Sequence, residues 1–241
     1  MAKPKKKKIL VTGGMGFIGH NVVRLLQSLK HDVQVVDALT SYGVTDKEEL
    51  EYLYNQRLTK INKKTQIYKI DIADSSLDQV FDSFKPDVVI HLASFPRQAT
   101  VRANPTEAAH TMCKGLVNVL DCCARHEVAK VLYASSSMVY GNFDDAKEDD
   151  QLNPSGSYSI WKIAGEELVK EYNRNTGLDY VIVRPTAVYG PMDVSDRVVS
   201  KFLISAMRDE TLNVNGADET LDFTFVDDCA TGIVLASLGH T

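Results

Sequence analysis

The sequence predicts an α/β protein built on a doubly wound parallel sheet, and three observations support this. Apolar segments of strand length alternate with segments of helix length along most of the chain. A glycine-rich turn joins the first predicted strand to the first predicted helix. The 241 residues, 44% of them hydrophobic and 24% charged, suffice for one such domain with a sizeable core and a small appendage.

The glycine-rich turn covers residues 12–19 and reads Thr-Gly-Gly-Met-Gly-Phe-Ile-Gly. A buried strand at 9–11 precedes it, and a helix that includes residues 21–26 follows it. Glycines in this spacing let the chain turn sharply and let the helix pack closely on the strand. The free N–H groups at the start of the helix then point at an anion, typically a dinucleotide pyrophosphate. The turn therefore predicts a Rossmann-type nucleotide site.

The second predicted strand, at 31–36, ends at Asp37. This lies at about the distance from the glycines at which a carboxylate accepts hydrogen bonds from an adenosine ribose. A βαβ turn without a nucleotide remains the alternative interpretation of these two features.

The same alternation continues through the rest of the chain. Further strands are predicted at 66–70, 87–92, 128–134 and 178–184, and helices at 76–84, 106–126 and 157–176. Repeated β-then-α units indicate a parallel sheet, whose ligands bind beyond the carboxyl ends of the strands. After Pro185 the pattern loosens to a helix at 198–207, a short strand at 212–214 and a helix at 227–238.

Charge and composition narrow the class of protein. The net charge of −5 gives no reason to expect nucleic-acid binding, and the lysine-rich residues 1–8 are predicted to be a solvated basic leader. No apolar run reaches the roughly 18 residues that span a membrane, and no secretion signal is evident, so we expect a cytoplasmic protein. The four cysteines form no metal-spaced cluster, so we expect reduced thiols and no metal.

A candidate catalytic group begins the helix at 157–176. Tyr158 and Lys162 are four residues apart and therefore share one helix face. A free phenol has a pKa of about 10, and a nearby ammonium favours the phenolate and lowers that pKa. Such a pair alone is more often structural, but here the fifth strand ends in Ser135, Ser136 and Ser137. A serine hydroxyl there is placed to hold a substrate oxygen beside the tyrosine.

These segments together resemble the extended short-chain dehydrogenase/reductases, in the NAD-dependent nucleotide-sugar epimerase/dehydratase family. The resemblance is UDP-glucose 4-epimerase-like and runs from Lys8 to about Leu238. The segments that carry it are 12–19 (the TGxxGxxG loop), 91–93 (HxA), 136–141 (SxxVYG), 158–162 (YxxxK), 189–191 and 225–228.

The resemblance implies specific roles for these residues. Ser136, Tyr158 and Lys162 would be catalytic, as the hydroxyl donor, the base and the ribose-holding lysine. NAD would be held by Gly13, Gly16, Phe17, Ile18, Gly19, Asp37, Asp71, Ile72, Leu92, Ala93, Tyr158, Lys162 and Pro185. NAD is expected rather than NADP, because the carboxylate of Asp37 repels a 2′-phosphate. A homodimer through the helices near Thr106 and Ser157 is also implied.

The expected reaction is epimerisation of a nucleotide-diphosphate sugar, at C4, through a transient 4-keto sugar, a step of carbohydrate biosynthesis. A 4,6-dehydratase needs carboxylates between the catalytic hydroxyl and the VYG segment, where this chain has Ser137 and Met138. A thioether transfers no proton, so the usual machinery for elimination is missing. A nucleotide-sugar dehydrogenase or ketoreductase, a 4,6-dehydratase and a catalytically weak NAD-sensing or scaffold protein remain the alternatives.

The chain also departs from the family pattern at positions that hold the substrate diphosphate. Ala187 stands where asparagine is usual, and Leu221 where arginine is usual. We therefore expect Arg97 and Arg102, which follow the fourth strand, to bind the substrate together with Ser136 and Ser137. The expected domains are 9–185, the NAD-binding domain with the catalytic residues, and 186–241, a partial substrate-binding region that stops early.

Overall fold

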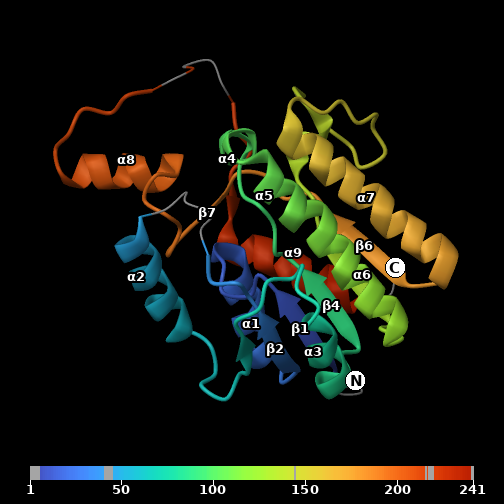
Figure 1. Ribbon diagram of the computed structural model, residues 1–241. Helices are drawn as coiled ribbons and strands as arrows, with labels where there is room; N and C mark the ends of the chain where they lie inside the picture. Colours follow the sequence, from blue (N-terminus) through green and yellow to red (C-terminus); the bar gives the residue numbers. More distant parts are fainter. Residues whose placement is uncertain (1–5, 41–45, 144, 215, 217–219, 240–241) are drawn as a thin grey trace.

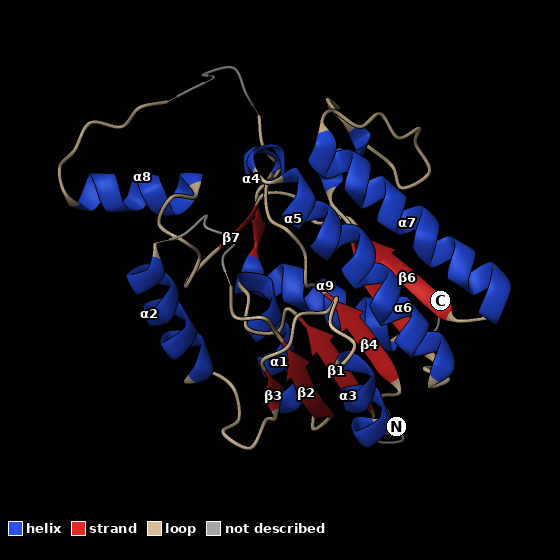
Figure 2. Cartoon of the chain, in the orientation of Figure 1, coloured by secondary structure: helices blue, strands red, loops and turns tan. Residues whose placement is uncertain are grey.

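The computed structural model describes residues 6–40, 46–143, 145–214, 216 and 220–239. Within them, six parallel strands form one sheet in the order β3-β2-β1-β4-β5-β6 (Figures 1 and 2). Its strands are β1 (Lys8–Thr12), β2 (Asp32–Val36), β3 (Ile67–Tyr68), β4 (Val88–His91), β5 (Lys130–Ala134) and β6 (Asp179–Val183). The order reverses between β1 and β4, which opens a crevice at the carboxyl ends of these strands. The predicted Rossmann-type, doubly wound fold is confirmed.

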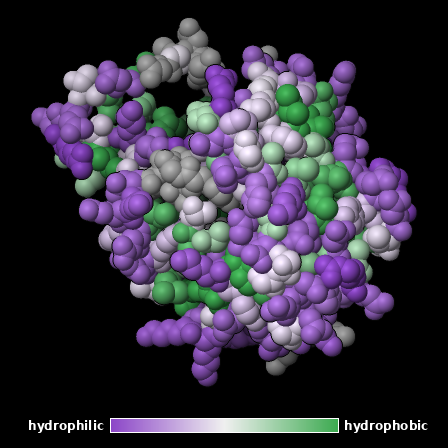
Figure 3. Space-filling model, viewed as in Figure 1, coloured by the Kyte–Doolittle hydropathy of each residue, from purple (hydrophilic) through white to green (hydrophobic). Residues whose placement is uncertain are grey.

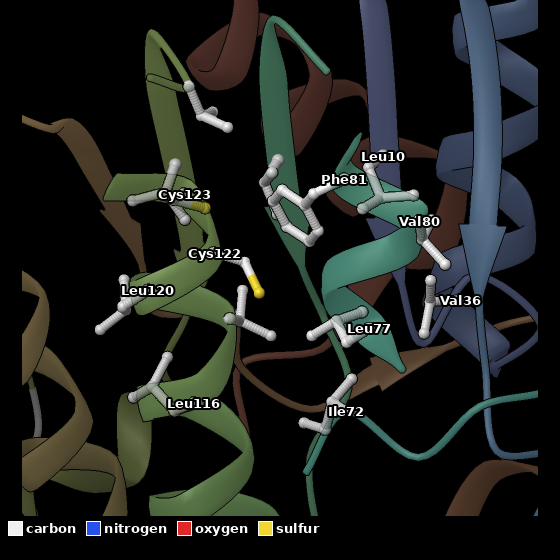
Figure 4. Packing of buried hydrophobic residues seen from close by; sticks show 14 of the residues in the cluster. Leu10, Val36, Ile72, Leu77, Val80, Phe81, Leu116, Leu120, Cys122 and Cys123 are labelled. Atoms are coloured by element: carbon white, nitrogen blue, oxygen red, sulfur yellow. The ribbon is translucent and has the colours of Figure 1, made fainter. Parts of the chain in front are cut away.

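Helices cover both faces of the sheet. They are α1 (Phe17–Ser28), α2 (Lys47–Leu58), α3 (Leu77–Phe84), α4 (Gln98–Ala103), α5 (Pro105–Ala109), α6 (Leu116–Arg125), α7 (Ser157–Thr176), α8 (Val198–Met207) and α9 (Val226–Leu238). Helices α1 and α9 pack on one face, around Ile9 and Val11 of β1. Helices α3, α6 and α7 pack on the other face, around Leu10 (Figure 4). Alternate residues of a strand thus serve opposite cores, as expected for a sheet buried on both sides.

The helix predicted at 106–126 is interrupted. A π-helical turn, η1 (His110–Gly115), separates α5 from α6. A Cβ at Gly115 would lie 2.6 Å from the side chain of Ile72. Glycine at this position therefore lets the helix lie close to Ile72, in the loop after β3. Such π turns occur mostly as single bulges in helices, frequently at functional sites.

Other elements differ from the expected ones in detail. The third strand is shorter than predicted and has only two residues, Ile67–Tyr68. The prediction of a strand at 212–214 is wrong. Instead β7 (Val188–Tyr189) and β8 (Thr224–Phe225) form a parallel pair in the described part of the C-terminal region. The side chains of Leu212 and Val214 are exposed, so burial of these residues does not stabilise a strand there.

Helix α2 was not predicted, because its sequence has little hydrophobic periodicity. The Asp46 carboxylate caps its start by accepting the backbone N–H groups of Glu48 and Glu49. Its buried residues are Leu53 and Arg57. Helix α2 is therefore stabilised by its N-terminal cap and two buried side chains, without an amphipathic pattern.

The surface is mainly hydrophilic and is interrupted by apolar side chains (Figure 3). Helix α8 contributes several of these, because it has no buried residue: Val198, Leu203 and Met207 are all exposed. Among the described residues no helix is long and apolar enough to cross a membrane. Residues 1–5 of the expected basic leader lie outside the described part, and Lys8 is the first residue of β1.

Candidate functional site

A pocket opens at the carboxyl ends of the strands, where the strand order reverses. Its lining includes seven of the residues predicted to hold NAD: Gly13, Gly16, Asp37, Asp71, Ile72, Leu92 and Ala93. They come from four separate segments of the sequence, between β1 and the loop after β4. The structure therefore brings together residues that the sequence related only through motifs.

The glycine-rich turn is shaped by close contacts that exclude side chains. Gly13 has φ of +69°, and a Cβ there would lie 2.7 Å from the backbone nitrogen of Ala93. A Cβ at Gly19 would lie 2.1 Å from the carbonyl oxygen of Gly13. The turn, the loop after β4 and the start of α1 are thus packed backbone against backbone, as a close approach to a ligand requires.

Helix α1 begins at Phe17, and Gly16 before it supplies no side-chain cap. The first N–H groups of the helix, those of Phe17, Ile18 and Gly19, have no acceptor within the helix, and Gly16 directly before them lines the pocket. The His20 ring donates from Nδ1 to the Gly16 carbonyl at 3.0 Å. Burial lowers the pKa of His20 to about 4, so the ring is neutral at pH 7. The anion-binding capacity therefore comes from the helix N-terminus.

Asp37 is buried at the end of β2, and both its carboxylate oxygens accept backbone hydrogen bonds. The Met15 N–H donates to one oxygen at 2.8 Å, and the Leu39 N–H donates to the other at 2.9 Å. Burial raises the pKa of Asp37, and these hydrogen bonds act in the opposite direction. The carboxylate therefore ties the glycine-rich turn to β2 and still lines the pocket.

The residues after β3 form the far wall of the pocket. The Asp71 carboxylate accepts the Ala73 N–H at 2.8 Å, which shapes the turn, and Ile72 is buried against Gly115. The Asn118 amide of α6 donates to the carbonyls of Ile72 and Asp74. This wall is thus fixed from α6 and the π turn before it.

Ser136 and Tyr158 meet across the gap between β5 and α7. Ser136 is almost fully buried, its hydroxyl accepts the Met138 N–H at 3.2 Å, and its side chain lies close enough to the Tyr158 phenol to lower the pKa of that group. Burial raises the pKa of Tyr158, while the Ser136 side chain and the charge of Arg197 lower it. The structure therefore places Ser136 beside Tyr158, and the catalytic roles of both residues stay predictions.

Lys162 lies one turn along α7 from Tyr158, with its ammonium 5.7 Å from the centre of the Tyr158 ring. The ammonium donates to the Ala134 carbonyl at 2.7 Å and lies 5.4 Å from the Tyr133 ring. Burial lowers the pKa of Lys162 to about 7, and the Glu166 carboxylate opposes that shift. The lysine is thus a buried cation whose charge depends on its neighbours.

A family model described as "NAD dependent epimerase/dehydratase family" matches residues 9–239. The chain belongs to this family. It is 32% identical over 235 residues to a putative UDP-glucose 4-epimerase of Methanocaldococcus jannaschii, covering 95% of this chain and 72% of that relative.

Solved structures of the family share the fold. A Bacillus cereus UDP-glucuronic acid 4-epimerase, in complex with UDP-glucuronic acid and NAD, is 29% identical with a TM-score of 0.85; the match covers 95% of this chain and 72% of that one. A Streptomyces venezuelae dTDP-glucose 4,6-dehydratase with NAD bound is 26% identical with a TM-score of 0.83, covering 96% and 72%. Epimerases and dehydratases are thus both similar to this chain.

NAD is the cofactor of this family, and the pocket fits it. The glycine turn leaves no room for a Cβ at Gly13, Gly16 directly before α1 lines the pocket, and so does Asp37 at the end of β2. These are the features that hold a pyrophosphate and an adenosine ribose. Pro185, which follows β6, accepts the Ser137 N–H through its carbonyl and so borders the same region.

The two arginines predicted to bind the substrate, Arg97 and Arg102, do not line the pocket. Both terminal nitrogens of Arg97 bind the carboxylate of Asp196, in the segment before α8. Arg102 is exposed on the last turn of α4. Ser137 is half-buried at the start of the 3-10 turn η2 (Ser137–Tyr140). Their predicted roles stay predictions.

Sequence reasoning missed a buried ion pair behind Lys162. Glu166 is fully buried, and its two carboxylate oxygens accept from Nε and a terminal nitrogen of Arg184, at 2.9 and 2.7 Å. The other terminal nitrogen of Arg184 donates to the Tyr140 hydroxyl at 2.6 Å and to the Glu148 carbonyl at 2.8 Å. The available signal was Glu166 itself, four residues after Lys162 on the same helix face.

Arg57 was missed as well. It is buried, and its guanidinium donates to the carbonyls of Met15 and Met192, at 3.1 and 2.8 Å. It therefore joins the glycine-rich turn to the segment after β7. His91 is buried and hydrogen-bonded to Thr12. No group of metal ligands is found among the described residues, and all four cysteines are free.

Proposed function

We propose that the chain catalyses NAD-dependent epimerisation of a nucleotide-diphosphate sugar at C4, through a transient 4-keto sugar. The observation that carries the proposal is the placement of Ser136 beside Tyr158 and Lys162, at the same edge of the sheet as the pocket that fits NAD. Its family supplies the substrate class, because similar proteins include UDP-sugar 4-epimerases.

In the proposed reaction Tyr158 is the base. Its phenolate removes the proton of the sugar 4-hydroxyl, and the Ser136 hydroxyl holds the same oxygen. Bound NAD would supply the hydride-accepting and hydride-donating chemistry at C4. Tyr158 then gives the proton back to the oxygen after the sugar has presented its other face. The Lys162 ammonium, 5.7 Å from the centre of the Tyr158 ring, would stabilise the phenolate, and the charge of Arg197 lowers the pKa of the phenol.

Epimerisation rather than dehydration is proposed because of the residues between Ser136 and Tyr140. Ser137 and Met138 stand where elimination needs an acid and a base. Met138 is 40% exposed and presents a thioether, which transfers no proton. Returning the hydride to the other face of the same carbon requires no further acid or base.

The test is to incubate the NAD-loaded protein with a panel of UDP-, GDP- and CDP-sugars and to analyse the products by mass spectrometry and proton NMR. A product of unchanged mass with a changed C4 coupling, no net NADH and no product from Tyr158→Phe is expected. A product lighter by one water would contradict the proposal in favour of dehydration, and net NADH would favour a dehydrogenase. No product from any sugar would also contradict it.

The pairing of Arg97 favours a second candidate. An arginine expected to hold the substrate diphosphate is already bound to Asp196, and Ala187 and Leu221 stand where polar groups are usual. The second candidate is a protein that binds NAD with little turnover. It predicts tight NAD binding without product formation in the same assay.

We also propose the remaining roles predicted from the sequence. Residues 9–185 would bind NAD and carry the catalytic groups, residues 186–241 would contribute to the substrate site, and two chains would associate through the helices that begin near Thr106 and Ser157. Sedimentation of the NAD-loaded protein tests the last point, with a single species of twice the chain mass as the expected result.

A further inference from the structure

The first turn of α7, which carries Tyr158, is capped from another element. Gly156 precedes the helix and offers no side chain. Instead the side-chain carbonyl of Gln98, the first residue of α4, accepts the Tyr158 N–H at 2.8 Å. The N–H groups that begin a helix have no partner inside it, so an outside acceptor stabilises and orients them.

Gly156 is what allows this contact. Its φ is +101°, and a Cβ there would lie 2.0 Å from the amide nitrogen of Gln98. Any side chain at 156 would displace Gln98. The cap from α4 therefore requires glycine at position 156.

Apolar packing holds α4 against the same turn. Phe95 and Val101 are buried, and Tyr158 and Trp161 pack against the cluster they belong to. The Tyr158 ring is thus fixed on one side by α4 and its preceding loop, while its hydroxyl meets Ser136. Movement of α4 would change where the phenol points.

Gln98 is itself anchored through its neighbour in the sequence. Arg97 has φ of +65°, a conformation that costs energy for a residue with a side chain. Its guanidinium binds both carboxylate oxygens of Asp196. Asp196 precedes Arg197, whose charge acts on Tyr158. The segment before α8, the start of α4 and the first turn of α7 are therefore one connected unit.

We propose that Gln98 is a positioning residue for the phenol of Tyr158, and that the Arg97–Asp196 ion pair anchors it to the segment before α8. Placement of that segment and the aim of the phenol are then coupled. The role given to Tyr158 rests on the proposed function, whereas the cap itself does not.

The test compares Gln98→Met, which removes the acceptor at similar length, with Gln98→Glu, which keeps an acceptor and adds a charge. Gln79→Met, on the exposed side of α3, is the matched control. The first readout is hydrogen exchange of the Tyr158 amide in the NAD-loaded protein, by NMR. We expect about tenfold or faster exchange in Gln98→Met, and wild-type exchange in Gln98→Glu and the control. Unchanged exchange in Gln98→Met overturns the proposal, whether or not any sugar is turned over.

The second readout separates positioning from mere stability. In the wild type and variants, the Tyr158 phenol is titrated by NMR of 13C-labelled tyrosine with NAD bound. The carboxylate of Gln98→Glu is expected to raise the pKa of the phenol; an identical titration in wild type and Gln98→Glu overturns the proposal.

Turnover, once the sugar is identified, gives the third readout. We expect a kcat about 10- to 100-fold lower in Gln98→Met with KM within about twofold, restored by Gln98→Glu with its pH profile moved to higher pH. A smaller, similar loss is expected for Asp196→Asn, which loosens only the anchor. Wild-type kcat in Gln98→Met overturns the proposal. A wild type without turnover on any sugar contradicts the proposed function alone, because the first two readouts still decide the role of Gln98.

Discussion

The roles of single residues in this site depend on how deeply each side chain is buried and on which groups it binds. Glu166 illustrates this, because a fully buried carboxylate is tolerable only with its charge paired, and Arg184 pairs both oxygens. Arg184 in turn holds the Tyr140 hydroxyl, so the ion pair links α7, the end of β6 and the turn that follows Ser136.

Glu166→Gln should destabilise the protein by about 3–5 kcal/mol, because it leaves the Arg184 charge uncompensated. It should also lower the pKa of Lys162 further, since the carboxylate opposes the effect of burial. Urea unfolding measures the first effect. Glu167→Gln is the control, because Glu167 is 56% exposed in a surface pair and should cost less than about 1 kcal/mol. Equal losses in the two variants would contradict the prediction.

The lowered pKa of Lys162 also makes stability depend on pH. The folded-state pKa is about 7, below the ordinary lysine value of 10.5, so between these values the unfolded chain binds more protons. Stability from this group therefore rises with pH across that window, by about 1.4 kcal/mol per unit. Lys162→Met should remove this slope. Denaturant unfolding from pH 7 to 10 measures it, and parallel curves for the two proteins would show that the lysine is not the source.

At the scale of elements, the sequence predicted a segment well where the residues that determine its structure lie within that segment. The βαβ turn and helix α7 with its C-cap at Gly177 are of this kind. The helix expected at 106–126 is interrupted by a π turn that ends at Gly115, where the chain packs against Ile72, some forty residues earlier. Helix α2 was missed because its buried Arg57 contacts other segments, at Met15 and Met192, which the periodicity of its own sequence does not reveal.

The glycine-rich turn offers an element-scale test. Gly13→Ala and Gly177→Ala both place a side chain at positive φ, +69° and +75°. Only the first meets the backbone of Ala93, at 2.7 Å, while nothing lies within 4 Å at Gly177. Gly177→Ala should cost about 1 kcal/mol and leave NAD binding intact. Gly13→Ala should cost more and weaken NAD binding at least about tenfold. Calorimetric titration with NAD measures the difference, and equal affinities would contradict it.

The whole molecule places the carboxyl ends of β1, β2 and β4 around one pocket. Because NAD binds the folded state, saturating NAD, at about 100 times its Kd, should stabilise the protein by about 2.7 kcal/mol. NADP at the same concentration should stabilise it much less, since the Asp37 carboxylate repels a 2′-phosphate. Thermal unfolding with each nucleotide tests this, with Asp37→Ser as the variant expected to narrow the gap. Equal stabilisation by both in the wild type would refute it.

The sequence by itself determined the fold class, the place of the nucleotide pocket and the tyrosine–lysine pair. These depend on spacing along one stretch of chain, such as the glycines at 13, 16 and 19 or the four-residue step from Tyr158 to Lys162. Only the tertiary structure decided that Arg97 binds Asp196, that Glu166 binds Arg184 and that Gln98 caps α7. Each joins residues 18 to 99 positions apart, and partners of that kind are selected by packing in space, which no local pattern of residues records.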